Sequence, residues 1–328
     1  MWVVNCALCW LVMDALVGVV KCEPKCEDTT RRHATVPEFT CSDFSKPEDF
    51  GKHFKHGAEP GDLWFTLKDS KLDYIPAGFL GERRASMLEF TNVSLGAFVE
   101  PNSNRSLFSG LEPSLKRVTF THGSSLPHSW STLRPLGRLE ELVFFEMTHL
   151  NLTRDFNELP AGLRKVAIIR TGIGTVDDDW MSSLLNLENL RIQSSTLDKF
   201  TRSMLPRPAP RLRRLTIGDS SLTSLPDDFG EDFPVLTQAN VRQNLISTFS
   251  ESSLAPLRNK TTVVLSGNPV HCDCKVLFLS SYPDSWTYPE CSSPEELKNV
   301  SVRELTAEKL GCKSEKENDD SSHFGLDE

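Results

Sequence analysis

The sequence predicts an α/β solenoid, in which short strands form a curved parallel sheet on the concave face and disulfide-bonded caps close both ends. Three features support this fold class: an apolar motif returns about every 24 residues, the repeating part has no cysteine, and the chain begins with an apolar segment. The second apolar residue of the motif recurs at Leu67, Phe90, Phe120, Phe144, Ile168, Ile192, Ile217, Val241 and Leu265. The intervals between these positions are 23, 30, 24, 24, 24, 25, 24 and 24 residues. Such a period is typical of leucine-rich repeats.

Residues 1–20 form an apolar run that predicts a signal peptide, although Asn5 and Asp14 interrupt it and no Lys or Arg precedes it. A run of this kind is a signal sequence more often than a membrane-spanning helix. An uncleaved anchor is the alternative interpretation. No later run has the length of a membrane span, so the mature chain is expected to be secreted and to lack a transmembrane segment.

Residues 21–58 are expected to form an N-terminal cap, because a stack of repeats would otherwise expose its apolar core at the end. No cysteine lies between Cys41 and Cys272, so the cysteines are placed to close the two ends of the stack. Disulfides suit this role in an oxidising compartment. The expected bridge in this cap is Cys26–Cys41. Cys22 is then unpaired or bonded to another chain; alternatively, it replaces Cys26 as the partner of Cys41.

Residues 59–268 are expected to hold about nine repeats. The clearest unit contains Leu190 and Ile192, whose spacing suits a short strand with alternate residues buried. The fourth fixed position of this repeat class is usually Asn, because its side-chain amide bonds backbone groups of adjacent coils. Ser and Thr can make similar bonds more weakly. The residues found at this position are Ser70, Thr171, Ser195, Ser220, Asn244 and Asn268.

Two parts of the repeat region depart from the regular spacing. The 30-residue interval contains residues 101–106, Pro-Asn-Ser-Asn-Arg-Ser, which predict an extra loop. In the two units that follow, the next apolar residues, Leu126 and Leu150, come one position late.

Residues 269–312 contain Cys272, Cys274, Cys291 and Cys312, and this segment resembles the cysteine-rich C-terminal flank of extracellular leucine-rich repeat proteins. The resemblance implies the pairs Cys272–Cys291 and Cys274–Cys312, whereas spacing alone would allow three pairings. Residues 275–279 between these cysteines predict a short helix that closes the core. A zinc site that includes the neighbouring histidine is the alternative, but two disulfides fit a secreted chain better.

Composition argues against several functional classes. The net charge of −9 is unlike that of a nucleic-acid-binding protein, and part of it comes from residues 313–328, which are expected to form an acidic, disordered tail. The sequence has no nucleophile-elbow or metalloprotease motif, and its eight His lack metal-ligand spacing. Residues 177–179, all Asp, are interpreted as a solvated turn. We therefore expect no enzymatic activity, no catalytic residue, no bound metal and no cofactor.

The candidate binding surface is the concave face, which is formed by the strand residues that lie between the buried ones. Two groups of residues there are of interest: an apolar patch on adjacent strands and a basic stripe along consecutive strands. A patch of apolar residues beside a row of Arg is a plausible protein-binding site, and a sulfated glycan is the alternative ligand. A third interpretation is that the cations only solvate the strands. The predicted binding residues are Glu141, Val143, Phe145, Lys165, Ile169, Arg191, Arg214 and Arg242.

Asn-x-Ser/Thr sequons agree with secretion and predict a glycoprotein. Asn104, in the expected extra loop, is the best candidate for glycosylation, whereas the position of Asn92 near a strand could block modification. The five sequons are at Asn92, Asn104, Asn151, Asn259 and Asn299.

Segments spread over residues 22–312 resemble one family of secreted proteins. They are residues 75–81 (Ile-Pro-Ala-Gly-Phe-Leu-Gly), residues 225–229 (Leu-Pro-Asp-Asp-Phe) and residues 262–274, which end in Cys-Asp-Cys. Together they resemble the arthropod leucine-rich repeat proteins related to the non-catalytic subunit of a shrimp luciferin monooxygenase. The resemblance implies a secreted, non-enzymatic scaffold that associates with another protein. We therefore expect an extracellular binding protein, with a soluble innate-immune or glycan receptor and a matrix component as alternatives.

Overall fold

The computed structural model describes residues 23–54 and 62–312. The predicted signal peptide, Cys22, the end of the predicted cap and the acidic tail lie outside these ranges. The chain divides into two compact units, which are described separately below. Among the described residues, the first comprises 23–54, 62–148 and 158–162, and the second comprises 149–157 and 163–312.

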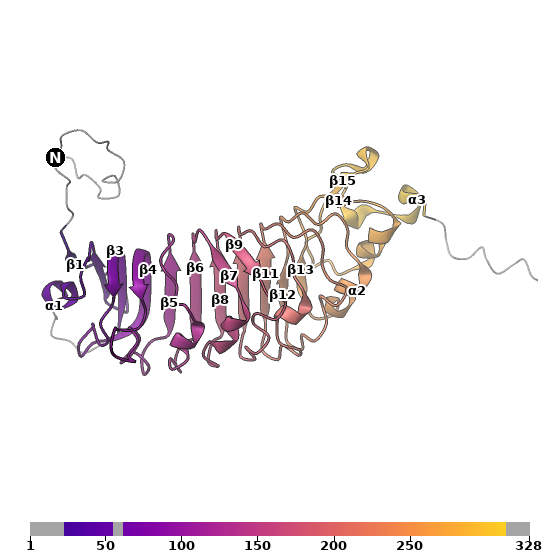
Figure 1. Cartoon of the computed structure of the whole chain (residues 1–328). Helices are drawn as coiled ribbons and strands as arrows, with labels where there is room; N and C mark the ends of the chain where they lie inside the picture. The colour runs from indigo at the N-terminus through magenta and orange to yellow at the C-terminus, as the bar shows by residue number, and fades with distance from the viewer. Residues whose placement is uncertain (1–22, 55–61, 313–328) are drawn as a thin grey trace, which may run out of the picture. The chain divides into compact units, whose positions relative to one another are not determined.

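The first unit contains strands that are hydrogen-bonded in the order β1-β2-β3-β4-β5-β6 (Figure 1). β1 and β2 are antiparallel, and each later strand is parallel to the one before it. One short α-helix, α1 (Asp49–His53), and the 3-10 helix η2 (Trp130–Leu133) lie between strands. The strand bounds are β1 (Lys25–Asp28), β2 (Glu38–Ser42), β3 (Asp62–Tyr74), β4 (Arg84–Ala97), β5 (Arg117–Thr121) and β6 (Glu141–Phe145).

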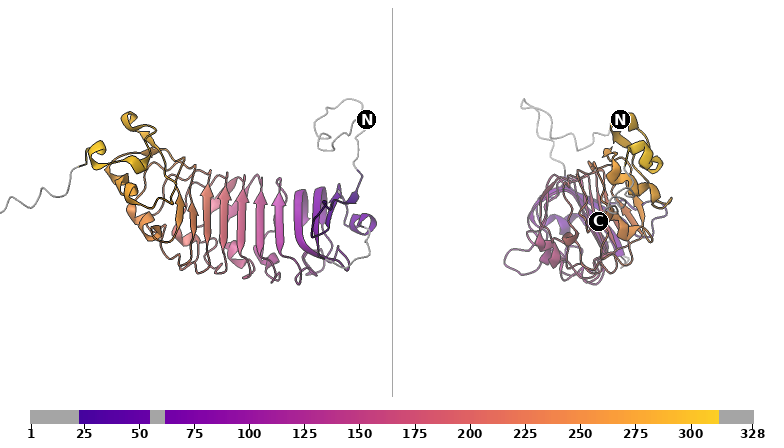
Figure 2. Two further views of the ribbon diagram at one scale, coloured as in Figure 1. Left: turned by 180° about the vertical axis from the view of Figure 1, so that it is seen from behind. Right: turned by 90° about the vertical axis from the view of Figure 1, so that its right-hand side faces the viewer.

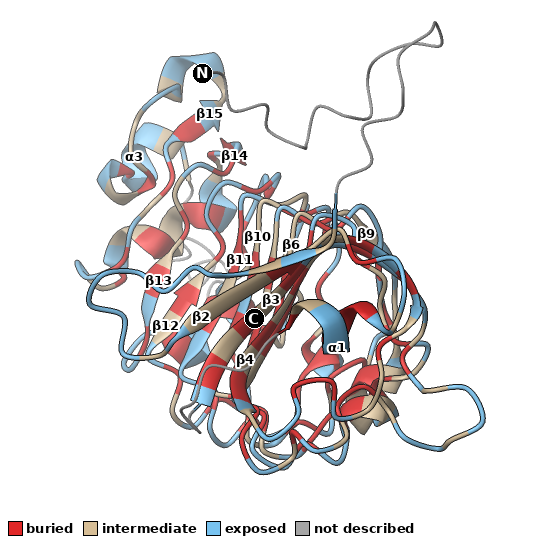
Figure 3. Cartoon of the chain, turned by 90° about the vertical axis from the view of Figure 1, so that its left-hand side faces the viewer, coloured by how far each residue is buried: buried red, intermediate tan, exposed pale blue. Residues whose placement is uncertain are grey.

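β3 and β4 are much longer than the short strands that the motif predicts. Buried residues alternate with more exposed ones along most of both strands (Figure 3). The two strands pair from Asp62↔Arg84 to Tyr74↔Ala97, so pairing continues beyond the apolar motif. A second stretch of apolar residues, including Leu72, lies in the continuation of each strand and is buried. This extra pairing explains their length.

The second unit contains the parallel sheet β8-β10-β11-β12-β13, whose strands lie side by side (Figure 2). It also contains two small sheets, β7-β9 and β14-β15. Its strands are β7 (Leu150–Leu152), β8 (Lys165–Ile169), β9 (Ile173–Val176), β10 (Asn189–Gln193), β11 (Arg214–Gly218), β12 (Gln238–Asn240), β13 (Thr262–Val264), β14 (Val270–His271) and β15 (Cys291–Ser293). Its helices are η3 (Arg154–Glu158, which starts in this unit), η4 (Arg202–Met204), α2 (Glu251–Leu254), η5 (Ala255–Leu257), η6 (Cys274–Ser281), η7 (Glu295–Leu297), η8 (Val302–Glu304) and α3 (Ala307–Leu310).

The apolar residues that define the period form the core of each unit. None of the nine motif residues is more than 1% exposed, which confirms the predicted inward face. Burying one such side chain stabilises the fold by roughly 1.5–3 kcal/mol. Because each repeat contributes only one edge of apolar side chains, the stack is stable only as a series of neighbours.

Several side chains at the fourth fixed position bond the backbone of the preceding repeat, as expected. The Nδ2 of Asn244 donates to the carbonyl of Ile217 at 2.8 Å, and its Oδ1 accepts from the backbone N–H of Leu222 at 3.2 Å. The hydroxyl of Ser195 accepts from the backbone N–H of Thr171 at 3.1 Å. A hydroxyl carries one proton, so Ser cannot replace all the donations of an Asn amide.

The irregular repeat around Phe120 contains a residue of this type that the sequence analysis missed. The hydroxyl of Ser124 accepts from the backbone N–H of Val93 at 3.0 Å and lies within 3.1 Å of the carbonyl of Phe90. Ser124 comes one position late because Gly123, with φ 71°, extends the turn by one residue. The late spacing therefore lengthens the turn without removing the bond between repeats.

A residue in the left-handed conformation ends the strand motif of successive repeats, a regularity that the sequence analysis also missed. Their φ values lie between 46° and 54°. Polar side chains tolerate this conformation better than β-branched ones. The residues are Asp69, Asn92, His122, Glu146, Arg170, Ser194, Asp219 and Gln243.

Disulfides close the ends, with the three pairings that the sequence analysis expected. Cys26–Cys41 joins β1 to β2, where a cluster of aromatic rings that includes Phe44, Phe50 and Phe65 is buried. In the second unit, Cys272–Cys291 joins the region of β14 to β15, and Cys274–Cys312 joins the start of η6 to the second residue beyond α3. The predicted helix at residues 275–279 is part of η6 and is a 3-10 helix.

The predicted extra loop at residues 101–106 is present. An antiparallel bridge between Val99 and Ser106 closes it, and Asn104 at its tip is exposed. The loop therefore leaves the stack without disturbing the pairing of β4 with β5.

Candidate functional site

The parallel sheet of the second unit has one face that points away from the core, which we call the open face. Strand register divides its residues into three levels. The first level comprises Lys165, Asn189, Arg214, Gln238 and Thr262. The second comprises Ala167, Arg191, Thr216, Asn240 and Val264. The third comprises Ile169, Gln193 and Gly218, followed by Arg242 and Ser266 just beyond the ends of β12 and β13.

Four cations are exposed on the open face, as the sequence analysis expected, but they do not form a single row. Lys165 and Arg214 occupy the first level, Arg191 the second and Arg242 the third. The predicted stripe is therefore a staggered arrangement. The reason is that the cations do not all occupy the same position within their strands, while the register between the strands is fixed. They therefore lie at different levels of the open face.

Within residues 23–54 and 62–312, none of these four cations forms an ion pair. Arg191 instead donates through Nε to the side-chain oxygen of Gln193 at 2.9 Å. The backbone N–H of Arg242 donates to the Oδ1 of Asn240 at 3.1 Å. The open face contains no carboxylate in any of its three levels, whereas the whole chain has a net charge of −9.

The outward-facing strand residues of the first unit differ from the open face of the second unit. Arg117 and Glu141, which are register partners on β5 and β6, approach each other to 3.9 Å. On this surface, the positive charge of Arg117 is therefore balanced by the negative charge of Glu141. Of the predicted binding residues here, Glu141 is half-buried and engaged with Arg117.

The predicted apolar patch is wrong as an exposed surface. Val143 is only 6% exposed, because it lies on β6 between Glu141 and Phe145, whose longer side chains share its face. Phe145 is half-buried and meets the ring of His122 edge-on, with centroids 6.2 Å apart. Ile169 is also half-buried and belongs to the second unit. The alternation of residues along a strand predicted which face these side chains lie on. It did not predict how far neighbouring side chains bury them.

Comparison with protein families supports the fold. A family model for the leucine rich repeat matches residues 210–270, and one for the leucine rich repeat C-terminal domain matches residues 289–313. The chain is a leucine-rich repeat protein. The matched segments contain β11, β12, β13 and β15, so the models cover part of the second unit and leave the divergent repeats unmatched.

The leucine-rich repeat chain is similar to Toll-like receptor 2 of several mammals. It is 27% identical to the protein of Mus musculus over 260 residues, which are 75% of this chain and 31% of that receptor. It is 24% identical to the protein of Macaca fascicularis over 302 residues, which are 88% of this chain and 36% of that receptor. The chain thus spans about a third of the length of these relatives.

A solved structure shares the leucine-rich repeat fold. It comes from an octameric complex of Latrophilin 3, Unc5D and the leucine-rich repeat part of FLRT2. The TM-score is 0.53 at 16% identity, with 77% of this chain and 83% of that chain covered. At this identity the likeness concerns the fold alone.

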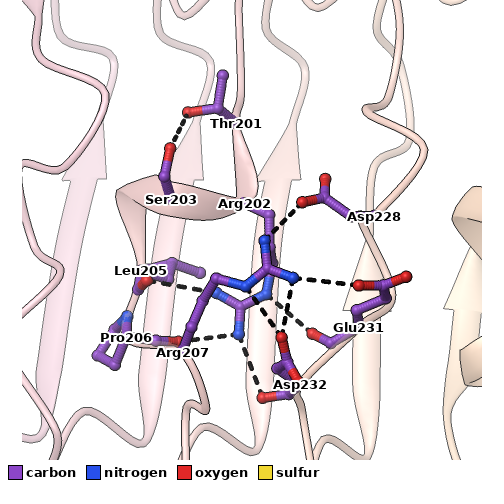
Figure 4. A network of polar contacts seen from close by, with 9 residues as sticks. All are labelled: Thr201, Arg202, Ser203, Leu205, Pro206, Arg207, Asp228, Glu231 and Asp232. Carbon is purple, nitrogen blue, oxygen red and sulfur yellow. Dashed lines mark hydrogen bonds and ion pairs between the residues drawn. The ribbon is translucent and has the colours of Figure 1, made fainter.

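A buried arginine network joins two adjacent repeats of the second unit, and sequence reasoning missed it (Figure 4). Arg202, 1% exposed, donates to the backbone carbonyls of Leu205, Pro206, Glu231 and Asp232 and lies 4.0 Å from the centre of the Phe233 ring. Burial, followed by the nearby charge of Arg207, lowers the pKa of Arg202 to about 10, so its side chain remains a cation at neutral pH.

Beside Arg202, the exposed Arg207 forms ion pairs with Asp228 at 2.7 Å, Asp232 at 2.9 Å and Glu231 at 3.1 Å. Hydrogen bonds to Asp228 and Asp232 raise the pKa of Arg207. The cation at Arg207 is thus fully engaged, in contrast to those of the open face. This network stabilises the stack and does not provide a ligand site.

The other polar clusters considered as sites have structural partners. Cys272 and Cys274 are in disulfides, and His271 contacts the hydroxyl of Ser293 at 2.9 Å, so the zinc alternative is wrong. Of the three Asp at residues 177–179, Asp179 pairs with Arg154 at 2.7 Å. In the part of the chain that the structure describes, no group of three or more His, Cys, Asp or Glu could hold a metal ion.

All five sequon asparagines are exposed, and none belongs to the open face of the second unit. Asn92 lies in β4, where its Nδ2 donates to the Oδ1 of Asp69 at 2.7 Å. Asn151 lies in β7, on a separate small sheet, and Asn259 precedes β13. Glycans attached at these five positions would therefore not be linked to any residue of the open face.

Proposed function

We propose that this leucine-rich repeat chain is a secreted, non-catalytic protein that binds an extracellular protein through the open face of its second unit. The observation that carries the proposal is that Lys165, Arg191, Arg214 and Arg242 share one face without any carboxylate and have no ion-pair partner among the described residues. On the strands of the first unit, by contrast, Arg117 is paired with Glu141. Exposed cations free of internal carboxylates can interact with an external partner.

Several features support an extracellular location. Three disulfides close the ends, and such bonds persist in oxidising compartments. Among the described residues, no helix has the length and apolar character of a membrane span. The predicted signal peptide and glycosylation sites agree with this location. Membership of the arthropod family named above remains a prediction.

The first prediction concerns capture of the partner. The variant with Arg191→Glu, Arg214→Glu and Arg242→Glu should lose a protein that the wild-type chain captures from extracellular fluid of its source. Reversal removes three favourable charges and adds three repulsive ones, so we expect at least about a tenfold loss of affinity. Quantitative mass spectrometry of captured proteins measures the loss.

A matched control reverses three exposed cations of the C-terminal flank, with Lys275→Glu, Lys298→Glu and Lys309→Glu. This control variant should still capture the partner. Its net charge changes by the same amount as that of the open-face variant, but its open face is unchanged. Undiminished capture by the open-face variant, with circular dichroism equal to that of the wild type, would exclude the proposal.

The similarity to Toll-like receptor 2 supports a second candidate, a soluble receptor-like protein of innate immunity, for which a glycan is the ligand to test. A glycan array probed with the purified chain distinguishes the two. Strong glycan binding that survives the open-face charge reversal would favour this candidate, whereas a single captured protein favours the first.

A further inference from the structure

We infer that the partner presents an extended acidic peptide segment to the open face, with its carboxylates seated on the staggered cations; this inference rests on the proposed function. It specifies the chemistry of the ligand, which neither the fold nor the similar proteins define. The argument depends on the spacing of the cations, the type of cation and the neutral residues between them.

The spacing follows from the strand register. Lys165 and Arg214 occupy the same level on strands that flank β10, so their Cα atoms are roughly 10 Å apart. Arg191 lies on β10 two residues further along, which places it roughly 8 Å from each of them. Alternate residues of an extended peptide are about 7 Å apart on one side of the chain. Flexible Arg and Lys side chains can absorb the difference.

The type of cation favours carboxylates. Three of the four are Arg, whose planar guanidinium can bind a carboxylate through two parallel hydrogen bonds. Because these guanidinium groups have no carboxylate partner within the described residues, binding would not first require an internal ion pair to break. Among the described residues, the side-chain contact of Arg191 with Gln193 is the one that would compete with a ligand.

The neutral residues favour a peptide over a sulfated glycan. Asn189 lies between Lys165 and Arg214 in register, and Thr216 is the register partner of Arg191. Amide and hydroxyl side chains both donate and accept, as peptide backbone groups do. A densely sulfated glycan offers mainly acceptors and would match a continuous group of cations, whereas here cations alternate with neutral polar residues.

The size of the surface sets the length of the segment. Four neighbouring strands, β8, β10, β11 and β12, span about 14 Å, and the three levels span about 13 Å along the strands. An extended segment of about five residues covers this area. The partner is therefore expected to use a short acidic stretch, and the rest of its contacts would lie outside the four cations.

The test uses the full-length chain and a fluorescein-labelled octapeptide of alternating Glu and Gly, followed by fluorescence anisotropy. Its Gln–Gly counterpart should bind at least about tenfold more weakly. Arg191→Gln with Arg214→Gln should reduce affinity for the Glu peptide at least about tenfold. The control Lys275→Gln with Lys309→Gln should leave it unchanged. Raising the salt concentration from about 50 to 200 mM should weaken binding several-fold.

Three results would overturn the inference. One is equal affinity for the Glu and Gln peptides. Another is displacement of the Glu peptide by a heparin oligosaccharide at a much lower concentration than by unlabelled Glu peptide, which would favour the glycan. The third is a tenfold gain in affinity after Glu315→Gln, Glu317→Gln, Asp319→Asn and Asp320→Asn in the full-length chain, which would make the chain's own C-terminal segment the occupant.

Failure of this inference is distinguishable from failure of the proposed function. If the open-face charge reversal abolishes capture of a partner but the Glu peptide does not bind, the surface is used for a ligand of other chemistry. If capture is unaffected by the reversal, the proposed function itself fails, whatever the peptide does.

Discussion

Arg202 has a guanidinium inside the second unit, where it donates to four backbone carbonyls from two neighbouring loops. Arg202→Lys keeps the charge but removes the fork geometry, so one ammonium must serve carbonyls that lie in different directions. We expect a loss of about 2–4 kcal/mol in the free energy of unfolding, because buried acceptors lose their donors. Urea denaturation followed by circular dichroism measures it.

Arg211→Lys is the matched control, because Arg211 is exposed and nearby in the chain. It should change stability by less than about 0.5 kcal/mol. Equal stabilities of the two variants would show that the network contributes little. The sequence could not identify Arg202, because an Arg between Thr201 and Ser203 looks the same whether its guanidinium reaches water or a buried set of carbonyls.

The repeats themselves differ in how strongly their fourth fixed position links them. Asn244 is 3% exposed and bonds backbone groups of two repeats, whereas the hydroxyl of the half-buried Ser220 donates to the carbonyl of Gly218 in its own repeat. Asn244→Ala should therefore reduce the free energy of unfolding by about 2–3 kcal/mol, and Ser220→Ala by about 1 kcal/mol or less.

Thermal or urea unfolding of both variants checks this difference. A Ser220→Ala loss as large as that of Asn244→Ala would contradict the assigned hydrogen bonds. The period predicted these positions correctly, since it fixes which residue of each repeat faces inward. It did not find Ser124, because that residue is displaced by the longer turn at Gly123, and the turn geometry depends on backbone conformation rather than on apolar spacing.

For the chain as a whole, the recurring apolar residues were sufficient to predict the fold, because each one must be buried against its neighbours. For the candidate binding residues, the sequence predicted only which face of the sheet they lie on. Alternation placed Lys165, Arg191 and Arg214 on the outward face, and they are exposed. The burial of Val143 depends on the sizes of side chains on its own and adjacent strands, and the staggered levels of the cations depend on register, so neither followed from one repeat alone.

The central claim is that recognition uses the open face of the second unit, and a glycan placed on that face tests it most directly. Gln193→Asn creates an Asn-Ser-Ser sequon at residues 193–195 on the open face and leaves all four cations in place. Leu245→Asn creates a matched sequon at residues 245–247, at an exposed position outside the three levels of the open face. Mass spectrometry of the variants, expressed with a secretion signal, shows whether each site is occupied.

The measurement is capture of the protein partner by the two glycosylated variants. We predict that the glycan at position 193 abolishes capture through steric exclusion, that enzymatic removal of this glycan restores it, and that the glycan at position 245 has no effect. Full capture by the variant with an occupied site at position 193 would contradict the account.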